Sequence, residues 1–305
     1  MKMPDQTEMP GVEYCAPPDR NLRAPSVSMG TLSCDCHAHI CGPESRYAYA
    51  DDRIYTPPDA LLPDYLEQLE ILGLERCVLV QPSIYGSDNR VMLGAMREMN
   101  TAGIACRGVA VLQDSVTDTE LDDLHQAGVR GLRFNLVDVA DTSGNASLQQ
   151  ILPLCERIAR LGWHTEFLLH ADDYPDFEAC FEAFPSDIVL GHSGYLRLGQ
   201  TVDNAGFQGM LRLAAAGKCW VKLTAPYRVS ASGELPFAEA GEFARALVDA
   251  APERVVWGSD WPHVKISTPM PNDADLCDLL FDWVADAQTR RQILVNNPTI
   301  LYDFC

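Results

Sequence analysis

The 305-residue sequence is short of positive charge. It has 23 lysines and arginines against 43 aspartates and glutamates, which gives a formal net charge of −20. A chain this acidic repels nucleic acids and anionic membrane surfaces, so we expect neither as a partner. An anionic small molecule would have to be attracted by individual arginines rather than by the overall field.

The sequence also lacks the features of membrane and secreted proteins. No apolar run approaches the ~20 residues that a membrane span needs, and the N-terminus has no apolar segment typical of a secretory signal. The eleven cysteines are odd in number and form no CxxC pair, which indicates reduced, mostly buried thiols. We therefore expect a cytoplasmic protein, and a homo-oligomer is compatible with this composition.

Short apolar runs alternate with helical patterns along most of the chain. Eight such runs are expected as strands, at residues 34–40, 76–81, 107–112, 129–136, 165–170, 187–192, 219–224 and 254–260. Strands buried on both faces and joined by helices form parallel sheets, and eight such units in about 250 residues predict a (β/α)8 (TIM) barrel of the α/β class. No GxGxxG or GxxxxGK loop follows any strand, which counts against the alternative, a doubly wound open sheet.

The first 33 residues differ from the rest in their many prolines, which break regular elements. These are Pro4, Pro10, Pro17, Pro18 and Pro25. We expect an irregular N-terminal arm over residues 1–33 and a single barrel domain over residues 34–305.

Two histidines lie two positions apart at the end of the first expected strand. Side chains alternate along a strand, so His37 and His39 point to the same face, together with Asp35. Two adjacent imidazoles can bind a metal or polarise one carbonyl oxygen. Taken alone, they could equally be two partly buried histidines without a chemical role.

Other polar residues are expected at the ends of the remaining strands, where a barrel places its active site. In chain order they are Ser83, Arg133, Asn135, His170, His192, Tyr195, Lys222, Thr224, Arg228 and Asp260. Four of the seven histidines fall at strand ends, which favours an active site over chance placement. A catalytically silent barrel used as a scaffold is the alternative from another class, and the intact set of histidines with Asp260 counts against it.

Three motifs resemble the amidohydrolase superfamily. They are DxHxH on the first strand (Asp35, His37, His39), LGHSG on the sixth (His192) and WGSDWPH on the eighth (Asp260). The sequence is most similar to the amidohydrolase-2 branch, which includes 2-pyrone-4,6-dicarboxylate lactonase and sugar lactonases. The resemblance extends from about Ser33 to the C-terminus and includes Tyr55, Ser83, Arg133 and Arg228.

The resemblance leaves the metal content open. The superfamily's bridging carbamylated lysine would come from the fourth strand, where this chain has Arg133 and Asn135, and this argues against a two-metal centre. The pyrone-dicarboxylate enzymes work without a metal, whereas His170 resembles a zinc ligand of the decarboxylase branch. The resemblance therefore implies either no required cofactor or one divalent metal, zinc, bound by His37, His39, His170 and Asp260.

The resemblance implies a hydrolase that opens the ester bond of a small lactone carrying a carboxylate or several hydroxyl groups. Asp260 would be the general base for water, with a pKa raised by a poorly solvated barrel mouth. Polarisation of the carbonyl is assigned to His37, His39 and His192. Alternative activities are a zinc-dependent nonoxidative decarboxylase of an aromatic or muconate-type acid, and a lactone isomerase.

Substrate binding is assigned to residues that can grip an anion or donate hydrogen bonds. Arg133 and Arg228 would hold a substrate carboxylate, and the hydroxyl donors would be Tyr55, Ser83 and Tyr195. Tyr195 follows HSG where the pyrone-dicarboxylate enzymes have an arginine, which argues against a doubly carboxylated substrate.

Overall fold

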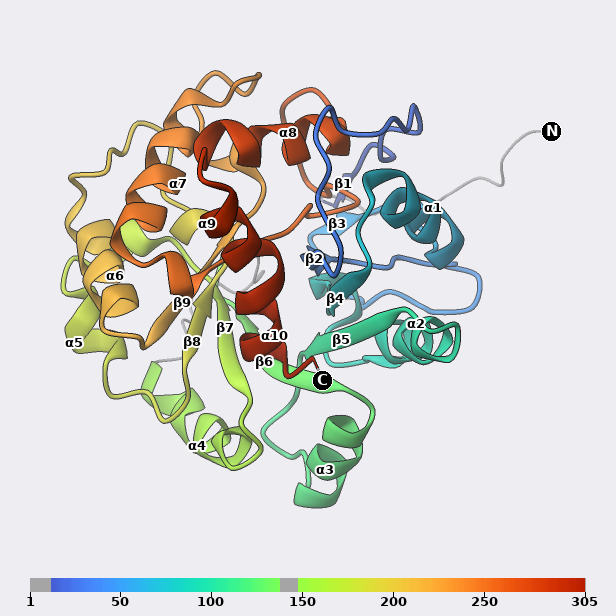
Figure 1. Ribbon diagram of the computed structural model, residues 1–305. Coiled ribbons are helices and arrows are strands. Elements are labelled where there is room, and N and C mark those ends of the chain that lie inside the picture. The colour runs from blue at the N-terminus through green and yellow to red at the C-terminus, as the bar shows by residue number, and fades with distance from the viewer. Residues whose placement is uncertain (1–11, 138–147, 305) are drawn as a thin grey trace.

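The computed structural model in Figure 1 describes residues 12–137 and 148–304. Eight parallel strands form the central sheet, in the order β10-β9-β8-β7-β6-β5-β4-β2. Their bounds are β2 Cys34–Ala38, β4 Arg76–Val80, β5 Ala105–Ala110, β6 Val129–Asn135, β7 His164–Leu168, β8 Ile188–Leu190, β9 Cys219–Leu223 and β10 Val255–Trp257. Helices surround the strands as an outer ring (Figure 1), so the predicted (β/α)8 barrel is confirmed.

The barrel closes between its first and last strands through backbone hydrogen bonds. The backbone N–H of Asp260 donates to the carbonyl of His37 at 2.9 Å, and that of His39 donates to Trp261 at 2.8 Å. A Cβ at Gly258 would lie 2.7 Å from the backbone nitrogen of His37, so this close approach requires glycine. Closure therefore places the end of β2 directly against the segment that carries Asp260.

The eighth strand is shorter than expected from the sequence. It ends at Trp257 instead of continuing to residue 260, and Asp260 has a left-handed φ of 67°. A residue with this backbone conformation cannot continue a β-ladder. The chain therefore turns at Asp260, and its side chain leaves the sheet at the rim of the barrel.

The helices follow the strands in chain order and cover the outer face of the barrel (Figure 1). Their bounds are α1 Leu62–Leu72, α2 Arg90–Thr101, α3 Asp118–Gln126, α4 Leu148–Ala159, α5 Phe177–Phe181, α6 Ala205–Ala215, α7 Ala238–Ala250 and α8 Asp273–Trp283. Local sequence sets several of their ends. At α3, for example, Thr117 and Glu120 form a reciprocal capping box, which satisfies backbone N–H groups that would otherwise lack a partner.

The last elements of the chain cover the end of the barrel where the strands begin. They are α9 (Ala287–Arg291), a π-helical segment (Gln292–Asn296) and α10 (Asn297–Tyr302). Arg76, at the start of β4, donates to the Val295 carbonyl at 2.9 Å. The opposite rim, where the strands end, remains available for a site.

The N-terminal arm reaches one of the loops on that rim. Strand β1 (Glu13–Tyr14) pairs in parallel with β3 (Tyr55–Thr56), so the arm is joined to the loop that carries Tyr55. In the part of the chain that the structure describes, none of the helices combines the length and apolar character that crossing a bilayer requires.

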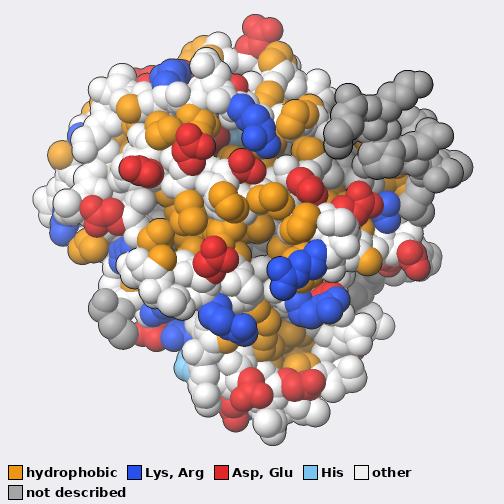
Figure 2. All heavy atoms as spheres, turned by 90° about the vertical axis from the view of Figure 1, so that its right-hand side faces the viewer, with side chains coloured by type: hydrophobic (Ala, Val, Ile, Leu, Met, Phe, Trp, Pro, Cys, Tyr) orange, Lys and Arg blue, Asp and Glu red, His pale blue; other side chains and the backbone are white. Residues whose placement is uncertain are grey.

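The surface also carries a groove that is separate from the rim. Figure 2 shows the face that carries α1 and α2, where apolar side chains gather among charged ones. A groove of about 1010 Å³ is lined by residues that include Leu66 and Glu70 of α1 with Arg76, Arg107 and Phe304. Because Arg76 begins β4 and Arg107 lies near the start of β5, this groove is at the opposite end of the barrel from the strand C-termini.

Candidate active site

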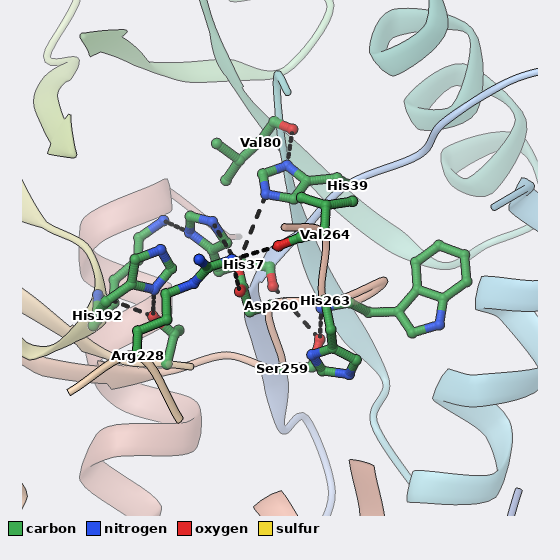
Figure 3. Close-up of polar contacts among 12 residues, drawn as sticks. His37, His39, Val80, His192, Arg228, Ser259, Asp260, His263 and Val264 are labelled. Carbon is green, nitrogen blue, oxygen red and sulfur yellow. Dashed lines mark hydrogen bonds and ion pairs between the residues drawn. The ribbon is translucent and has the colours of Figure 1, made fainter. Parts of the chain in front are cut away.

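Three histidines and one aspartate meet where the barrel closes. Asp260 Oδ1 lies 3.5 Å from His37 Nε2 and 3.8 Å from His39 Nε2 (Figure 3). The ring of His192, which follows β8, has its centroid 5.5 Å from that of His37. All four side chains are buried. The structure thus brings together the four residues that the sequence marks as catalytic candidates.

A small enclosed cavity adjoins this group. Its volume is about 20 Å³, enough for roughly one water molecule. Its walls include His39, His192 and Asp260, and all five residues assigned to substrate binding: Tyr55, Ser83, Arg133, Tyr195 and Arg228. Leu168, Val264 and Lys265 also line the cavity, and no pattern in the sequence pointed to them.

Two arginines from different parts of the chain line this cavity. Arg133, on β6, is buried, and its Nη1 donates to the Gln81 carbonyl at 2.7 Å. Its Nε has no hydrogen-bond partner among the described residues. Arg228, after β9, donates to the Val264 carbonyl at 2.7 Å and lies 3.4 Å from Asp260 Oδ2 (Figure 3). Guanidinium groups held in this way suit a bound carboxylate.

The second oxygen of Asp260 belongs to a buried polar network. Tyr227 donates its hydroxyl to Asp260 Oδ2 at 2.7 Å. The same hydroxyl is 3.1 Å from His263 Nδ1, and His263 Nε2 is 3.1 Å from Asp273 Oδ1. This network fixes Oδ2, so Oδ1 is the oxygen directed toward the histidines.

The pKa of Asp260 is lowered, and the expectation of a raised value was wrong. Burial by itself would raise this pKa, but two neighbours outweigh burial and hold the pKa below its ordinary value: His192, which is cationic at the acid pH where Asp260 takes up its proton, and Arg228. The sequence predicted a poorly solvated carboxylate correctly but did not show which charges would surround it. Asp260 is therefore ionised at neutral pH, as a general base must be.

The imidazole of His39 is oriented by a backbone carbonyl. Its Nδ1 is 2.8 Å from the Val80 oxygen (Figure 3), and a carbonyl can only accept, so Nδ1 carries a proton. Burial, assisted by Arg133, lowers the pKa of His39 to about 4, so the ring is neutral at pH 7. Its Nε2, which faces Asp260, then carries a lone pair.

His192 is held through a side-chain hydroxyl. Thr224 Oγ1 accepts a hydrogen bond from the His192 backbone at 3.0 Å and lies 2.8 Å from its Nδ1. Burial lowers the pKa of His192 to about 3, so this ring is also neutral at pH 7. With Nδ1 engaged, Nε2 is the ring nitrogen left for a substrate or a metal.

The loop that carries His192 is strained. His192, Ser193 and Tyr195 have left-handed φ values of 52°, 53° and 47°, which are unfavourable for residues with a Cβ. Such conformations persist only where the surrounding structure imposes them, and they concentrate at functional sites. The strain places Tyr195 beside His192, with ring centroids 5.4 Å apart.

His37, His192 and Asp260 could bind a metal ion. Each offers one ligand atom, and these atoms lie within 4.8 Å of one another. Two nitrogens and one carboxylate oxygen form a donor set that zinc accepts. The set predicted from the sequence has His39 and His170 in place of His192. His170 lies apart from this group of ligand atoms, with its Nδ1 2.6 Å from the Tyr195 carbonyl oxygen.

Asp35 of the DxHxH motif has a structural position behind the site. Its carboxylate accepts hydrogen bonds from the Ser259 backbone at 2.9 Å, from the Ser259 hydroxyl at 2.6 Å and from the Tyr65 hydroxyl at 3.0 Å. Burial raises the pKa of Asp35 to about 6 despite these bonds. Asp35 therefore joins the first strand to the residue that precedes Asp260.

Sequence reasoning gave no role to a buried ion pair beneath His37. Lys222 Nζ, on β9, lies 2.7 Å from Glu166 Oε2, on β7, and both side chains are almost completely buried. One signal was present in the sequence, because each is a charged residue inside an otherwise apolar strand run, TEFLLH and CWVKLT. Charged residues are rarely buried unless they are paired.

The buried histidines lead to a prediction about acid stability. Burial lowers the folded-state pKa of His37, His39, His164 and His192 below the ordinary 6.5. Between pH 6.5 and about 4 the unfolded chain binds these protons and the folded protein does not, so stability falls with falling pH. The difference between 6.5 and about 4 for His39 alone corresponds to about 3 kcal/mol.

Two groups oppose this effect. His263 has a pKa raised above 6.5, because the neighbouring Asp273 outweighs burial, so it binds its proton first in the folded state. Asp35, with a pKa of about 6, binds a proton in the folded state before it does so in the unfolded chain. The four histidines with lowered pKa values outweigh Asp35 and His263, so we expect the free energy of unfolding, measured with urea at pH 7, 5.5 and 4.5, to decrease along this series. A constant or rising value would contradict the neutral state assigned to the buried histidines.

The comparisons with known proteins agree with this site. Residues 34–304 match the amidohydrolase family model, and the chain belongs to the amidohydrolase family. This confirms the resemblance inferred from the motifs. The match includes every residue of the candidate site.

Two relatives within the family and one solved structure are similar to this chain over most of its length. The chain is 36% identical to a 2-pyrone-4,6-dicarboxylate hydrolase of Comamonas testosteroni over 293 residues, 92% of this chain and 93% of that protein. It is 33% identical to a 4-sulfomuconolactone hydrolase of Rhizobium radiobacter over 294 residues, 96% and 97% of the two chains. A ligand-free crystal structure of an Agrobacterium tumefaciens protein superposes with a TM-score of 0.82 at 26% identity, covering 92% of this chain and 99% of that one.

Proposed function

We propose that the protein is a hydrolase that opens the ester ring of a small lactone bearing at least one anionic group. The observation that carries the proposal is the ionised Asp260 beside neutral imidazoles, in a cavity that two arginines also line. Both relatives described above are lactone hydrolases. They support hydrolysis rather than the alternatives of decarboxylation or isomerisation.

Asp260 supplies the base. Its carboxylate takes a proton from a water molecule as the water oxygen bonds to the lactone carbonyl carbon. The ring C–O bond then breaks, and Asp260 returns the proton to the departing ring oxygen. Tyr227 stabilises Oδ2 throughout, because its hydroxyl donates to that oxygen at 2.7 Å.

The histidines have separate tasks in this proposal. His39 presents a lone pair on Nε2, since its proton is on the Nδ1 that faces Val80, so it can accept a hydrogen bond from the attacking water. We therefore assign His39 to orienting the water. Polarisation of the carbonyl, which needs donors, is assigned to His37 and His192.

The side chains around the cavity favour an anionic substrate. Arg133 and Arg228 can each form charge-assisted hydrogen bonds with a carboxylate, and Lys265 adds a third cationic side chain to the lining. Tyr55, Ser83 and Tyr195 can form hydrogen bonds with the remaining oxygens of the substrate. With Lys265, three cationic residues line the cavity, and a substrate with two anionic groups could pair with them.

A divalent metal, zinc by its donor set, would be held by His37, His192 and Asp260, and when bound it would polarise the substrate carbonyl. The base, the hydrogen-bond donors and the anion site are side chains of the protein itself. We therefore expect turnover to persist after metal removal.

A lactone panel tests the proposal. We expect acid release, followed with a pH indicator, from a carboxylated 2-pyrone or a muconolactone with an anionic substituent, and much slower release from a neutral sugar lactone. Metal content is measured on the same sample before and after chelation. Release of CO2, or ring migration without acid release, would contradict lactone hydrolysis.

A further inference from the structure

The Lys222–Glu166 pair is placed to act on His37. Besides its ion pair with Glu166, Lys222 Nζ lies 2.9 Å from the Cys36 carbonyl oxygen and 3.3 Å from His37 Nδ1. The exposed fraction of the Lys222 side chain is 0% and that of Glu166 is 2%. The pair therefore lies inside the barrel, directly beneath the residue that contacts Asp260.

The ammonium group of Lys222 determines which partner donates and which accepts in its contact with His37. Lys222 has only donors, so the nitrogen of His37 that faces it must accept. An imidazole ring carries a proton on at least one of its two nitrogens. The proton of His37 is therefore on Nε2, which lies 3.5 Å from Asp260 Oδ1.

The other tautomer of His37, with its proton on Nδ1, is disfavoured by the same neighbours. Glu166 Oε1 is 3.5 Å from His37 Nδ1 and could accept from it if Nδ1 carried the proton. That proton would then point toward the ammonium group, which is closer, at 3.3 Å. Lys222 thus competes successfully with Glu166 for Nδ1.

The stability of the fold does not by itself explain why an ion pair is buried. Burying two charges costs free energy that their attraction recovers only in part, and apolar residues of similar volume often serve the fold as well. Among the described residues, His37 Nε2 is a buried polar atom without a hydrogen-bond partner, and it lies 3.5 Å from Asp260 Oδ1. Control over whether His37 Nε2 donates a hydrogen bond would explain why the Lys222–Glu166 pair is buried.

We infer that Lys222, held by Glu166, is a positioning residue that keeps His37 in the tautomer with its proton on Nε2, directed toward Asp260 and the substrate. The inference deepens the proposed function and rests on it for the role of His37 as a donor to the carbonyl. It also means that a metal could bind His37 Nε2 only after this proton had moved.

The experiment measures the tautomer and the kinetics separately. In metal-free protein labelled with ¹⁵N-histidine, long-range ¹H–¹⁵N spectra distinguish protonated from unprotonated ring nitrogens, and a His37→Asn variant assigns the His37 signals. We expect wild-type His37 to show an unprotonated Nδ1 and a protonated Nε2. In Lys222→Met we expect the proton to shift to Nδ1, toward Glu166, with kcat lowered about 10- to 100-fold and KM nearly unchanged.

Two further variants separate positioning from folding. Lys222→Met/Glu166→Leu removes both charges and should restore stability lost in the single variant. Neither neighbour then selects a tautomer, so both tautomers should be populated and kcat should stay low. Lys218→Met removes an exposed lysine just before β9 and should behave like the wild type. A protonated Nδ1 in the wild type, or wild-type kcat in the folded double variant, would overturn the inference. Absence of lactone turnover in the wild type would reject the proposed function, and the spectra would still decide the tautomer.

Discussion

Replacing Asp260 with asparagine is expected to lower kcat for lactone hydrolysis about 10²- to 10⁴-fold, the usual contribution of a general base. Asparagine has nearly the same shape and can still accept from Tyr227, which donates to Oδ2 at 2.7 Å in the wild type. It cannot take a proton from water. The initial rate of acid release, measured at saturating and limiting substrate, gives the effect on kcat and on kcat/KM.

A matched control separates loss of the base from loss of negative charge. Asp122 is an exposed aspartate on α3 that pairs with Arg160 at 3.1 Å, and Asp122→Asn should retain wild-type activity. Circular dichroism and urea unfolding establish that Asp260→Asn is folded. Wild-type turnover by a folded Asp260→Asn protein would show that another residue supplies the base.

Replacing Arg133 with methionine is expected to lower kcat/KM for an anionic lactone about 10- to 100-fold, because hydrogen bonds to charged groups are worth ~1.5–3 kcal/mol. The Nε of Arg133 is buried and has no partner among the described residues, so it is suited to a substrate carboxylate. Kinetics with the free acid and with its methyl ester measure the effect, and the preference for the acid should fall.

The ester comparison also shows whether Arg133 acts through binding. If kcat/KM fell equally for acid and ester, the loss would be structural, because Arg133 also donates to the Gln81 carbonyl at 2.7 Å. Arg197→Met provides the control for the loss of an arginine. Arg197 is half-exposed and pairs with Asp172 and Asp173, so its replacement should leave the preference for the acid unchanged.

Much of the site was predictable, because in a barrel the spacing of residues along each strand determines which side chains lie together at the rim. The two-residue spacing of His37 and His39 places them on one face of a strand. Parallel strands joined by helices end at one rim, so His192 and Asp260 were expected near them although they are distant in sequence. The five predicted binding residues line the same cavity for the same reason.

The electrostatics of the site were not predictable in the same way. The pKa of Asp260 is lowered because His192 and Arg228 lie near it, whereas its sequence neighbours suggested only burial. The contact between Lys222 and His37 joins residues 185 positions apart. Charged residues inside apolar strands were visible in the sequence, but their partners were not.

The sequence by itself determined the fold and the rim that carries the site, because both follow from side-chain periodicity and strand order, and its resemblance to a known family pointed to the proposed base and its neighbouring histidines. Only the tertiary structure decided which nitrogen of His37 and His39 carries a proton, and in which direction the pKa of Asp260 moves. Those properties depend on contacts of a few ångströms between separate strands, such as Val80 with His39 at 2.8 Å, and such contacts form only when the barrel closes.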